Sequence, residues 1–219
     1  MKGFLIYPEY KIIADKAYVL LFGRLENGES FLTINYFRPY FYIKKSDLKF
    51  AEEFGEFEHQ DNEFKSFKGE NVVKIILDIP ADVPKLRKKF EENQIECYES
   101  DIKFAYRFMM DNNIQGSLDI DGEYEIGDRV DRVYKNPEIK AVDYIPDNLK
   151  VLSFDIESSK GNPNDELYCI GYIFDKEKKV LINSQDKIKG TVSFKNEEEL
   201  IERFLEYVRD LDPDIITGW

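Results

Sequence analysis

The chain has 219 residues, of which 42% are hydrophobic, enough apolar material for one large domain or two small ones. Its 44 acidic and 31 basic residues give a net charge of −13, which argues against broad attraction to nucleic acid but is compatible with a local basic patch and with metal-binding acids. The apolar runs are too short to cross a bilayer and no signal peptide is recognisable, so we expect a cytoplasmic chain without membrane contact.

The cysteine and histidine content limits the possible chemistry. Cys97 and Cys169 stand alone on strand-like segments, which predicts free thiols rather than a zinc site or a disulfide. His59 is the only histidine and lies in an acidic stretch, so we do not expect Ser-His or Cys-His catalysis.

The N-terminal part of the chain predicts an α+β domain over residues 1–130. Alternating apolar and polar residues indicate strands before residue 45, and residues 45–70 are polar enough to predict short helix and loop. Further along, Val83, Leu86 and Phe90 recur at helical spacing. The predicted strands are 4–7, 17–22, 30–36, 37–43, 71–79 and 96–99, and the predicted helices follow Pro80 and cover 103–110.

Residues 131–150 are charged and contain two prolines, which predicts a connector between domains. Residues 151–219 then predict three antiparallel strands, a helix that begins at Asn196 with Glu199 completing a capping box, and a strand parallel to the first. This order is the opening of an α/β ribonuclease-H-like fold, left incomplete.

Two acids stand out on the strand predicted for residues 151–157. Asp155 and Glu157 are two residues apart, so their side chains project from the same face of the strand. Two neighbouring carboxylates repel each other unless a cation lies between them, and carboxylate oxygens suit Mg²⁺ or Mn²⁺. The alternative is an exposed strand face with two solvated acids. Phe154 and Ile156 are expected in the core.

Four segments in register resemble family B DNA polymerases of the archaeal type. Residues 151–157 are similar to the family's first exonuclease motif, and residues 212–219 to the run that leads into its second. Residues 37–42 and 101–107 resemble two landmarks of the N-terminal domain, and the resemblance covers the whole chain.

This resemblance implies a DNA-directed DNA polymerase with a 3′→5′ proofreading exonuclease. It implies that Asp155 and Glu157 are catalytic and bind Mg²⁺ or Mn²⁺, in a two-metal site only partly present here. The implied partners are primer-template DNA, single-stranded template, the remainder of the polymerase and a sliding clamp reached through a part absent from this sequence.

The resemblance also implies that the first domain captures uracil in the template strand. Lys103 departs from the family, which usually has proline at this position, and Tyr10 competes with Tyr7 for the N-terminal wall. The alternative is that these residues simply pack the domain. The implied pocket positions are Tyr7, Pro39, Tyr40, Pro80, Val83, Ile102, Phe104 and Arg107.

The sequence lacks the acids of the family's later exonuclease motifs and all its polymerase motifs. An expression fragment, a split-gene product or a piece of a nicked enzyme would each explain this, and we expect the chain alone to bind Mg²⁺ weakly and to be nearly inactive. Two other functions remain open: a non-catalytic DNA-binding or assembly module that docks a separate polymerase chain, and a free-standing exonuclease with rearranged acids.

Overall fold

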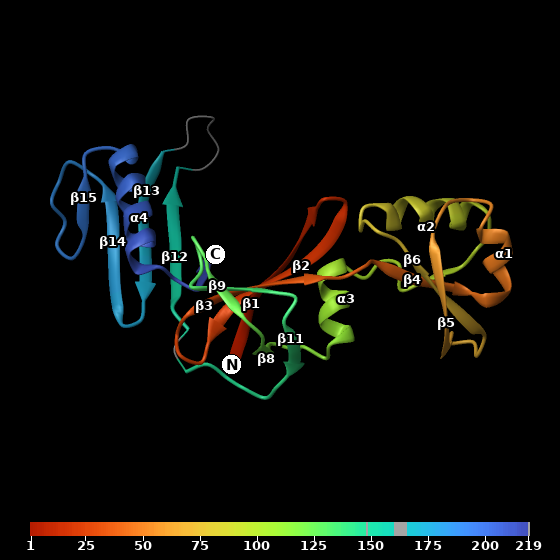
Figure 1. Ribbon diagram of the computed structural model, residues 1–219. Coiled ribbons are helices and arrows are strands. Elements are labelled where there is room, and N and C mark those ends of the chain that lie inside the picture. Colours follow the sequence, from red (N-terminus) through yellow and green to blue (C-terminus); the bar gives the residue numbers. More distant parts are fainter. Residues whose placement is uncertain (148, 160–165, 219) are drawn as a thin grey trace. The chain divides into compact units, whose positions relative to one another are not determined.

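The computed structural model describes residues 1–147, 149–159 and 166–218 (Figure 1). The chain forms two compact units, Met1–Ile145 and Pro146–Trp219. Mixed sheets with few helices build both units, so the protein is of the α+β class. Among the described residues no helix is long and apolar enough to cross a membrane.

The larger sheet of the first unit contains seven strands. In spatial order they are β11 (Glu138–Ala141), β8 (Ser117–Asp121), β1 (Lys2–Ile13), β2 (Lys16–Leu25), β3 (Ser30–Tyr36), β10 (Arg132–Lys135) and β9 (Tyr124–Ile126). Because side chains alternate along β2, Ala17, Val19 and Leu21 all enter the core from one face. Helix α3 (Phe104–Asp111) packs against this face through Phe104 and Phe108.

A second, four-stranded sheet completes the first unit. In spatial order its strands are β5 (Glu58–Lys65), β6 (Asn71–Ile76), β4 (Tyr40–Lys44) and β7 (Cys97–Tyr98). The associated helical segments are η1 (Lys45–Asp47), α1 (Leu48–Ala51) and α2 (Asp82–Glu92). Leu86 and Phe90 of α2 are buried against Phe41 and Ile75, so the predicted helix is confirmed.

Strand β5 corrects the prediction of short helix and loop for residues 45–70. Only the first part of that range, η1 and α1, is helical, whereas β5 pairs antiparallel with β6. The strand lies at the edge of its sheet and nearly all its side chains are exposed. An edge strand without a buried face has no apolar alternation, which explains why its sequence resembles a loop.

The second unit is built on one five-stranded sheet. In spatial order its strands are β15 (Val192–Phe194), β14 (Glu177–Asn183), β13 (Leu167–Phe174), β12 (Val151–Ser158) and β16 (Ile215–Gly218). The predicted pairings are confirmed, because β12, β13 and β14 are antiparallel neighbours and β16 runs parallel to β12.

Helix α4 (Glu197–Leu211) covers one face of this sheet. It begins where the capping box predicts, because the Asn196 side chain accepts a hydrogen bond of 2.9 Å from the Glu199 N–H. Its apolar stripe packs against Leu152, Ile170 and Leu181. The opposite face of the sheet has no helix of this unit on it among the described residues.

The predicted connector is partly sheet. Strands β10 and β11 lie within residues 131–150 and pair with β3 and β8, so the first unit extends to Ile145. Both strands have only four residues; β11 is mostly exposed, and Tyr134 is the one buried residue of β10. Their charged side chains and the intervening Pro137 therefore have the composition of a linker.

Ile156 is exposed rather than buried, contrary to expectation. It lies on the same face of β12 as Leu152 and Phe154, but its exposed fraction is 49%. Phe154 is half-buried, with its ring 5.2 Å from that of Phe204 in α4. The helix thus covers only the first half of β12, and alternation alone could not show where that cover ends.

Gly23 should be intolerant of any side chain. A Cβ on Gly23 would collide with the Phe4 carbonyl oxygen and lie 2.6 Å from the fully buried Phe31 ring, so Gly23→Ala should lower the free energy of unfolding by about 3 kcal/mol. Gly116→Ala is the control, because its Cβ would meet only the Phe4 ring at 3.4 Å, and we expect a change within about 0.5 kcal/mol. Urea titration measures both, and equal losses would contradict the packing described.

Candidate functional site

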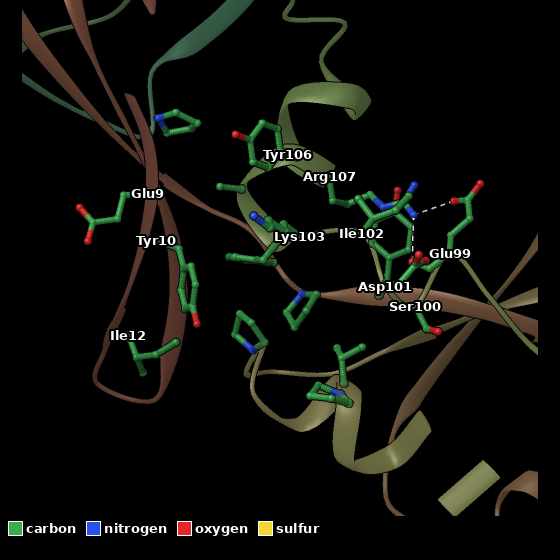
Figure 2. Close-up of a pocket in the computed structure, with 18 of the residues that line it drawn as sticks. Glu9, Tyr10, Ile12, Glu99, Ser100, Asp101, Ile102, Lys103, Tyr106 and Arg107 are labelled. Atoms are coloured by element: carbon green, nitrogen blue, oxygen red, sulfur yellow. Dashed lines mark hydrogen bonds and ion pairs between the residues drawn. The ribbon is translucent and has the colours of Figure 1, made fainter. Parts of the chain in front are cut away.

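The first unit contains a cavity of about 1110 Å³ beside the first turn of α3 (Figure 2). Its walls come from β1, the start of β4, the start of α2 and the segment 99–107. All eight residues predicted for the uracil pocket lie in these walls: Tyr7, Pro39, Tyr40, Pro80, Val83, Ile102, Phe104 and Arg107. These residues come from four separate segments and meet only in the folded chain.

A β-bulge decides which tyrosine of β1 faces α3. The register between β1 and β2 shifts between Leu5 and Tyr7, so Tyr7 pairs with Phe22 and Tyr10 pairs with Val19, a core residue. The Tyr10 ring therefore lies on the α3 side, 5.5 Å from the Phe104 ring in an edge contact. Tyr7 borders the cavity, but 58% of it is exposed.

Tyr40 is held rigidly in the cavity wall. Its hydroxyl donates to the carboxylate of Asp111, whose two oxygens lie at 2.7 and 2.8 Å. The Lys74 ammonium lies 4.0 Å and the Arg107 guanidinium 4.8 Å from the centre of its ring. Burial and the hydrogen bond to Asp111 raise the pKa of Tyr40, so its hydroxyl stays a neutral donor.

Arg107 is a buried cation in the same wall. Its exposed fraction is only 6%, and its guanidinium lies 2.6 Å from a carboxylate oxygen of Glu99 and also donates to the Glu99 carbonyl at 3.3 Å (Figure 2). Its Nε is buried and has no hydrogen-bond partner in the part of the chain that the structure describes. A buried donor without a partner is a rare feature in folded proteins.

Sequence reasoning missed three polar residues around this cavity. Asp111 and Lys74 fix Tyr40, and Glu99 fixes Arg107. Asp111 is the last residue of α3, Lys74 is in β6, and Glu99 follows β7, so no spacing in the sequence links them to their partners. These contacts join separate elements of the first unit, which a motif cannot show.

In the second unit, Asp155 and Glu157 project from the face of β12 opposite α4. Both are exposed, and neither forms an ion pair with any residue that the structure describes. An Asp155 Oδ1 oxygen accepts the N–H of Ile156 at 3.0 Å. The neighbour of Asp155 across the sheet is Gly171, so no side chain crowds it there.

The chemistry of this pair fits a hard divalent cation. Mg²⁺ is commonly held by one or two carboxylates, with water and phosphate oxygens filling the other positions. Asp155 also borders a shallow hollow of about 570 Å³ together with Ser153, Gly171 and Thr217. Among residues 1–147, 149–159 and 166–218, no third histidine, cysteine or acid gathers with the pair. The pair can therefore supply only part of a coordination sphere.

Sequence comparison defines the class of protein. Residues 95–219 match the profile of the exonuclease domain of DNA polymerase family B, so the chain belongs to this family. Its similar proteins include the DNA polymerases of Archaeoglobus fulgidus, 31% identical over 100% of the chain, of Methanocaldococcus jannaschii, 30% identical over 95%, and of Thermococcus litoralis, 27% identical over 95%.

The chain spans only part of these relatives: 29%, 13% and 12% of their respective lengths. A structural match agrees with the sequence match. The family B DNA polymerase of Pyrobaculum calidifontis superposes with a TM-score of 0.78 over 100% of this chain and 30% of its own, at 22% identity. The likeness to that structure shows the fold.

Proposed function

We propose that the chain is the N-terminal portion of a DNA-directed DNA polymerase with a 3′→5′ proofreading exonuclease. In this proposal residues 1–130 bind the template strand and residues 151–219 form an incomplete ribonuclease-H-like unit that supplies two metal ligands. The observation that carries the proposal is the cavity of the first unit, in which four separate segments bring together all eight residues for which the resemblance implies uracil capture. The membership of family B supports it.

The residues that line the cavity support uracil capture. Uracil is a flat base that differs from thymine by one missing methyl group, so a close apolar wall can admit the first and reject the second. Val83 lies in this wall and is the side chain suited to exclude the methyl group. Pro39 and Pro80 add rigid surfaces, and the clamped ring of Tyr40 adds a flat one.

In the second unit, Asp155 and Glu157 would hold Mg²⁺ or Mn²⁺ against the 3′ end of a DNA strand. The chemistry that such a metal supplies when bound is activation of water and stabilisation of the leaving oxygen. The two carboxylates are accessible, form no salt bridge with any described residue and share one face of β12. Their role is to bind and orient, so both must be ionised.

The proposed partners are primer-template DNA, single-stranded template and the remainder of the polymerase. A sliding clamp would be bound through parts of the polymerase outside this chain, and the proposed location is the cytoplasm. The absence of a third ligand among the described residues argues against a free-standing exonuclease with rearranged acids.

A second candidate function is a non-catalytic module that binds DNA and docks a separate polymerase chain. The open face and edge of the second sheet favour it. Ile173 and Ile216 are 43% and 54% exposed, and β16 is an edge strand. An uncovered sheet edge with apolar neighbours readily accepts another chain. Docking and metal binding are separable, because docking needs no carboxylate pair.

Val83 should control the choice between uracil and thymine. We expect the wild-type chain to bind a single strand with one uracil about tenfold more tightly than the same strand with thymine, and Val83→Ala to reduce this preference to about threefold or less by making room for the methyl group. Fluorescence anisotropy measures both affinities. Val142→Ala, a half-buried valine outside the cavity walls, is the control. Equal affinities of the wild-type chain for the two strands would refute uracil capture.

Asp155 should carry metal binding by the second unit. We expect weak Mn²⁺ binding by electron paramagnetic resonance, and Asp155→Asn should weaken it by roughly tenfold because a ligand charge is lost. Asp175→Asn is the matched control: Asp175 is an exposed turn residue with φ of 53°, a conformation that asparagine tolerates. We also expect no appreciable digestion of DNA by the chain alone. Robust metal-dependent 3′→5′ digestion would overturn this expectation.

A further inference from the structure

Gly171 lies in β13, the central strand of the second sheet, at a position where the fold does not require glycine. Its φ lies outside the left-handed region, and a Cβ built on it would meet no atom of any described residue beyond its chain neighbours within 4 Å. It pairs with Asp155 on one side and Val180 on the other, with no register shift at either place. Backbone conformation, packing and a β-bulge therefore all fail to explain this glycine.

The other three glycines that lie in described strands are required by close packing. A Cβ on any of them would approach a phenylalanine ring or a main-chain oxygen to 2.7 Å or less. They are Gly3, Gly23 and Gly218. Glycine inside a strand loses more conformational entropy on folding than other residues and packs no side chain. Gly171 therefore lowers the stability of its strand with no compensating contact among the described residues.

The missing side chain of Gly171 leaves space in the hollow that Asp155 borders. This hollow of about 570 Å³ is also lined by Ile173 and Val180. Strand pairing places these side chains on the same face of the sheet as Asp155, opposite α4. Ile173 and Val180 are 43% and 38% exposed, so the described residues leave an apolar surface uncovered next to a carboxylate.

Gly171 is the direct cross-strand neighbour of Asp155. Side chains opposite each other in an antiparallel pair have Cβ atoms about 4.5–5.5 Å apart, so any side chain at position 171 would lie against the Asp155 carboxylate. A metal held by Asp155 and Glu157 needs room for further ligands, because two carboxylates fill only part of its coordination sphere. Glycine is the residue that leaves this side of Asp155 free.

We propose that Gly171 controls access to the metal site, because the nucleotide at the 3′ end of a DNA strand lies in the hollow over its bare backbone. In this arrangement the sugar and base contact Ile173 and Val180, and the phosphate points toward the metal held by Asp155. The inference rests on the proposed function, since it takes the ligand beside Asp155 to be a metal ion with a DNA end. The contribution of Gly171 to the site is the space that it leaves.

A segment of polypeptide is the alternative occupant of this space, because close approach of another backbone also favours glycine in strands. Such a segment would cover the Asp155 carboxylate as well, since Asp155 borders the same hollow. A covered carboxylate loses its hydration and resists the ionisation that metal binding requires. A nucleotide instead brings phosphate oxygens, which complete the coordination of the metal, so the observations favour the nucleotide.

The test compares Gly171→Ala and Gly171→Val with the wild-type chain of 219 residues. Both fill free space in a strand, so the Tm of the second unit should rise, by about 2–4 °C for the valine variant. The affinity for thymidine 5′-monophosphate in the presence of Mn²⁺, measured by nuclear magnetic resonance titration, should fall about threefold with alanine and about tenfold with valine. Stability and binding thus move in opposite directions, and the loss of binding grows with the size of the side chain.

Mn²⁺ without nucleotide distinguishes steric exclusion from damage to the site. The ion is small and both carboxylates stay in place, so Gly171→Val should change the Mn²⁺ affinity less than about twofold by electron paramagnetic resonance. Gln60→Val is the control, because it places valine at an exposed position of β5 in the first unit and should leave both affinities unchanged. Equal losses of Mn²⁺ and nucleotide affinity in Gly171→Val would indicate a distorted strand and overturn the inference.

The failure of this inference is distinguishable from the failure of the proposed metal site. If the wild-type chain binds Mn²⁺ but Gly171→Val does not weaken nucleotide binding, the inference fails and metal binding by Asp155 stands. If the wild-type chain binds no Mn²⁺, the metal site fails and the inference fails with it. A lower Tm in both Gly171 variants would show that the fold requires glycine here, which would also overturn the inference.

Discussion

The packing of α3 against the β1–β2 hairpin is the contact on which the first unit depends. Phe104 and Phe108 bury themselves against the face formed by Val19 and Leu21, and this contact fixes where the helix begins. The cavity lies where that packing ends, so the first turn of α3 is held by core residues on one side and borders open space on the other. Phe104 belongs both to the core and to the cavity wall, and its ring also contacts the ring of Tyr10. Under the proposed function, this rigid wall would distinguish uracil from thymine by shape.

In the second unit, too, the packing of a helix against a sheet determines where the candidate site lies. Helix α4 buries one face of its sheet, and the period of two along β12 places Leu152 and Phe154 under the helix and the two acids on the other side. The acids are therefore held by a strand whose alternate residues are in the core. Two carboxylates supported in this way keep their spacing, which the proposed metal binding requires.

The basic side chains near the cavity of the first unit act on their immediate neighbours, although the chain as a whole is acidic. With a net charge of −13, the chain as a whole repels a polyanion, yet Lys74, Lys103 and Arg107 gather at or near one cavity. Lys74 and Arg107 both lie against the ring of Tyr40, and Arg107 also forms a salt bridge with Glu99, so they act by fixing side chains. Lys103 forms no ion pair with any described residue.

The sequence by itself determined the family, most strands, the start of α4 and the common face of Asp155 and Glu157, because these depend on local periodicity, capping and short motifs. Tertiary structure alone decided that β5, β10 and β11 are strands, since the edge strands β5 and β11 bury too little to show alternation and β10, with four residues, is too short to show it. It also decided that Tyr10 meets Phe104 and that Ile156 is exposed. The Tyr10 contact depends on a single bulge, which reverses alternation along β1. The exposure of Ile156 depends on where α4 stops covering β12. Both are properties of three-dimensional packing rather than of any local pattern.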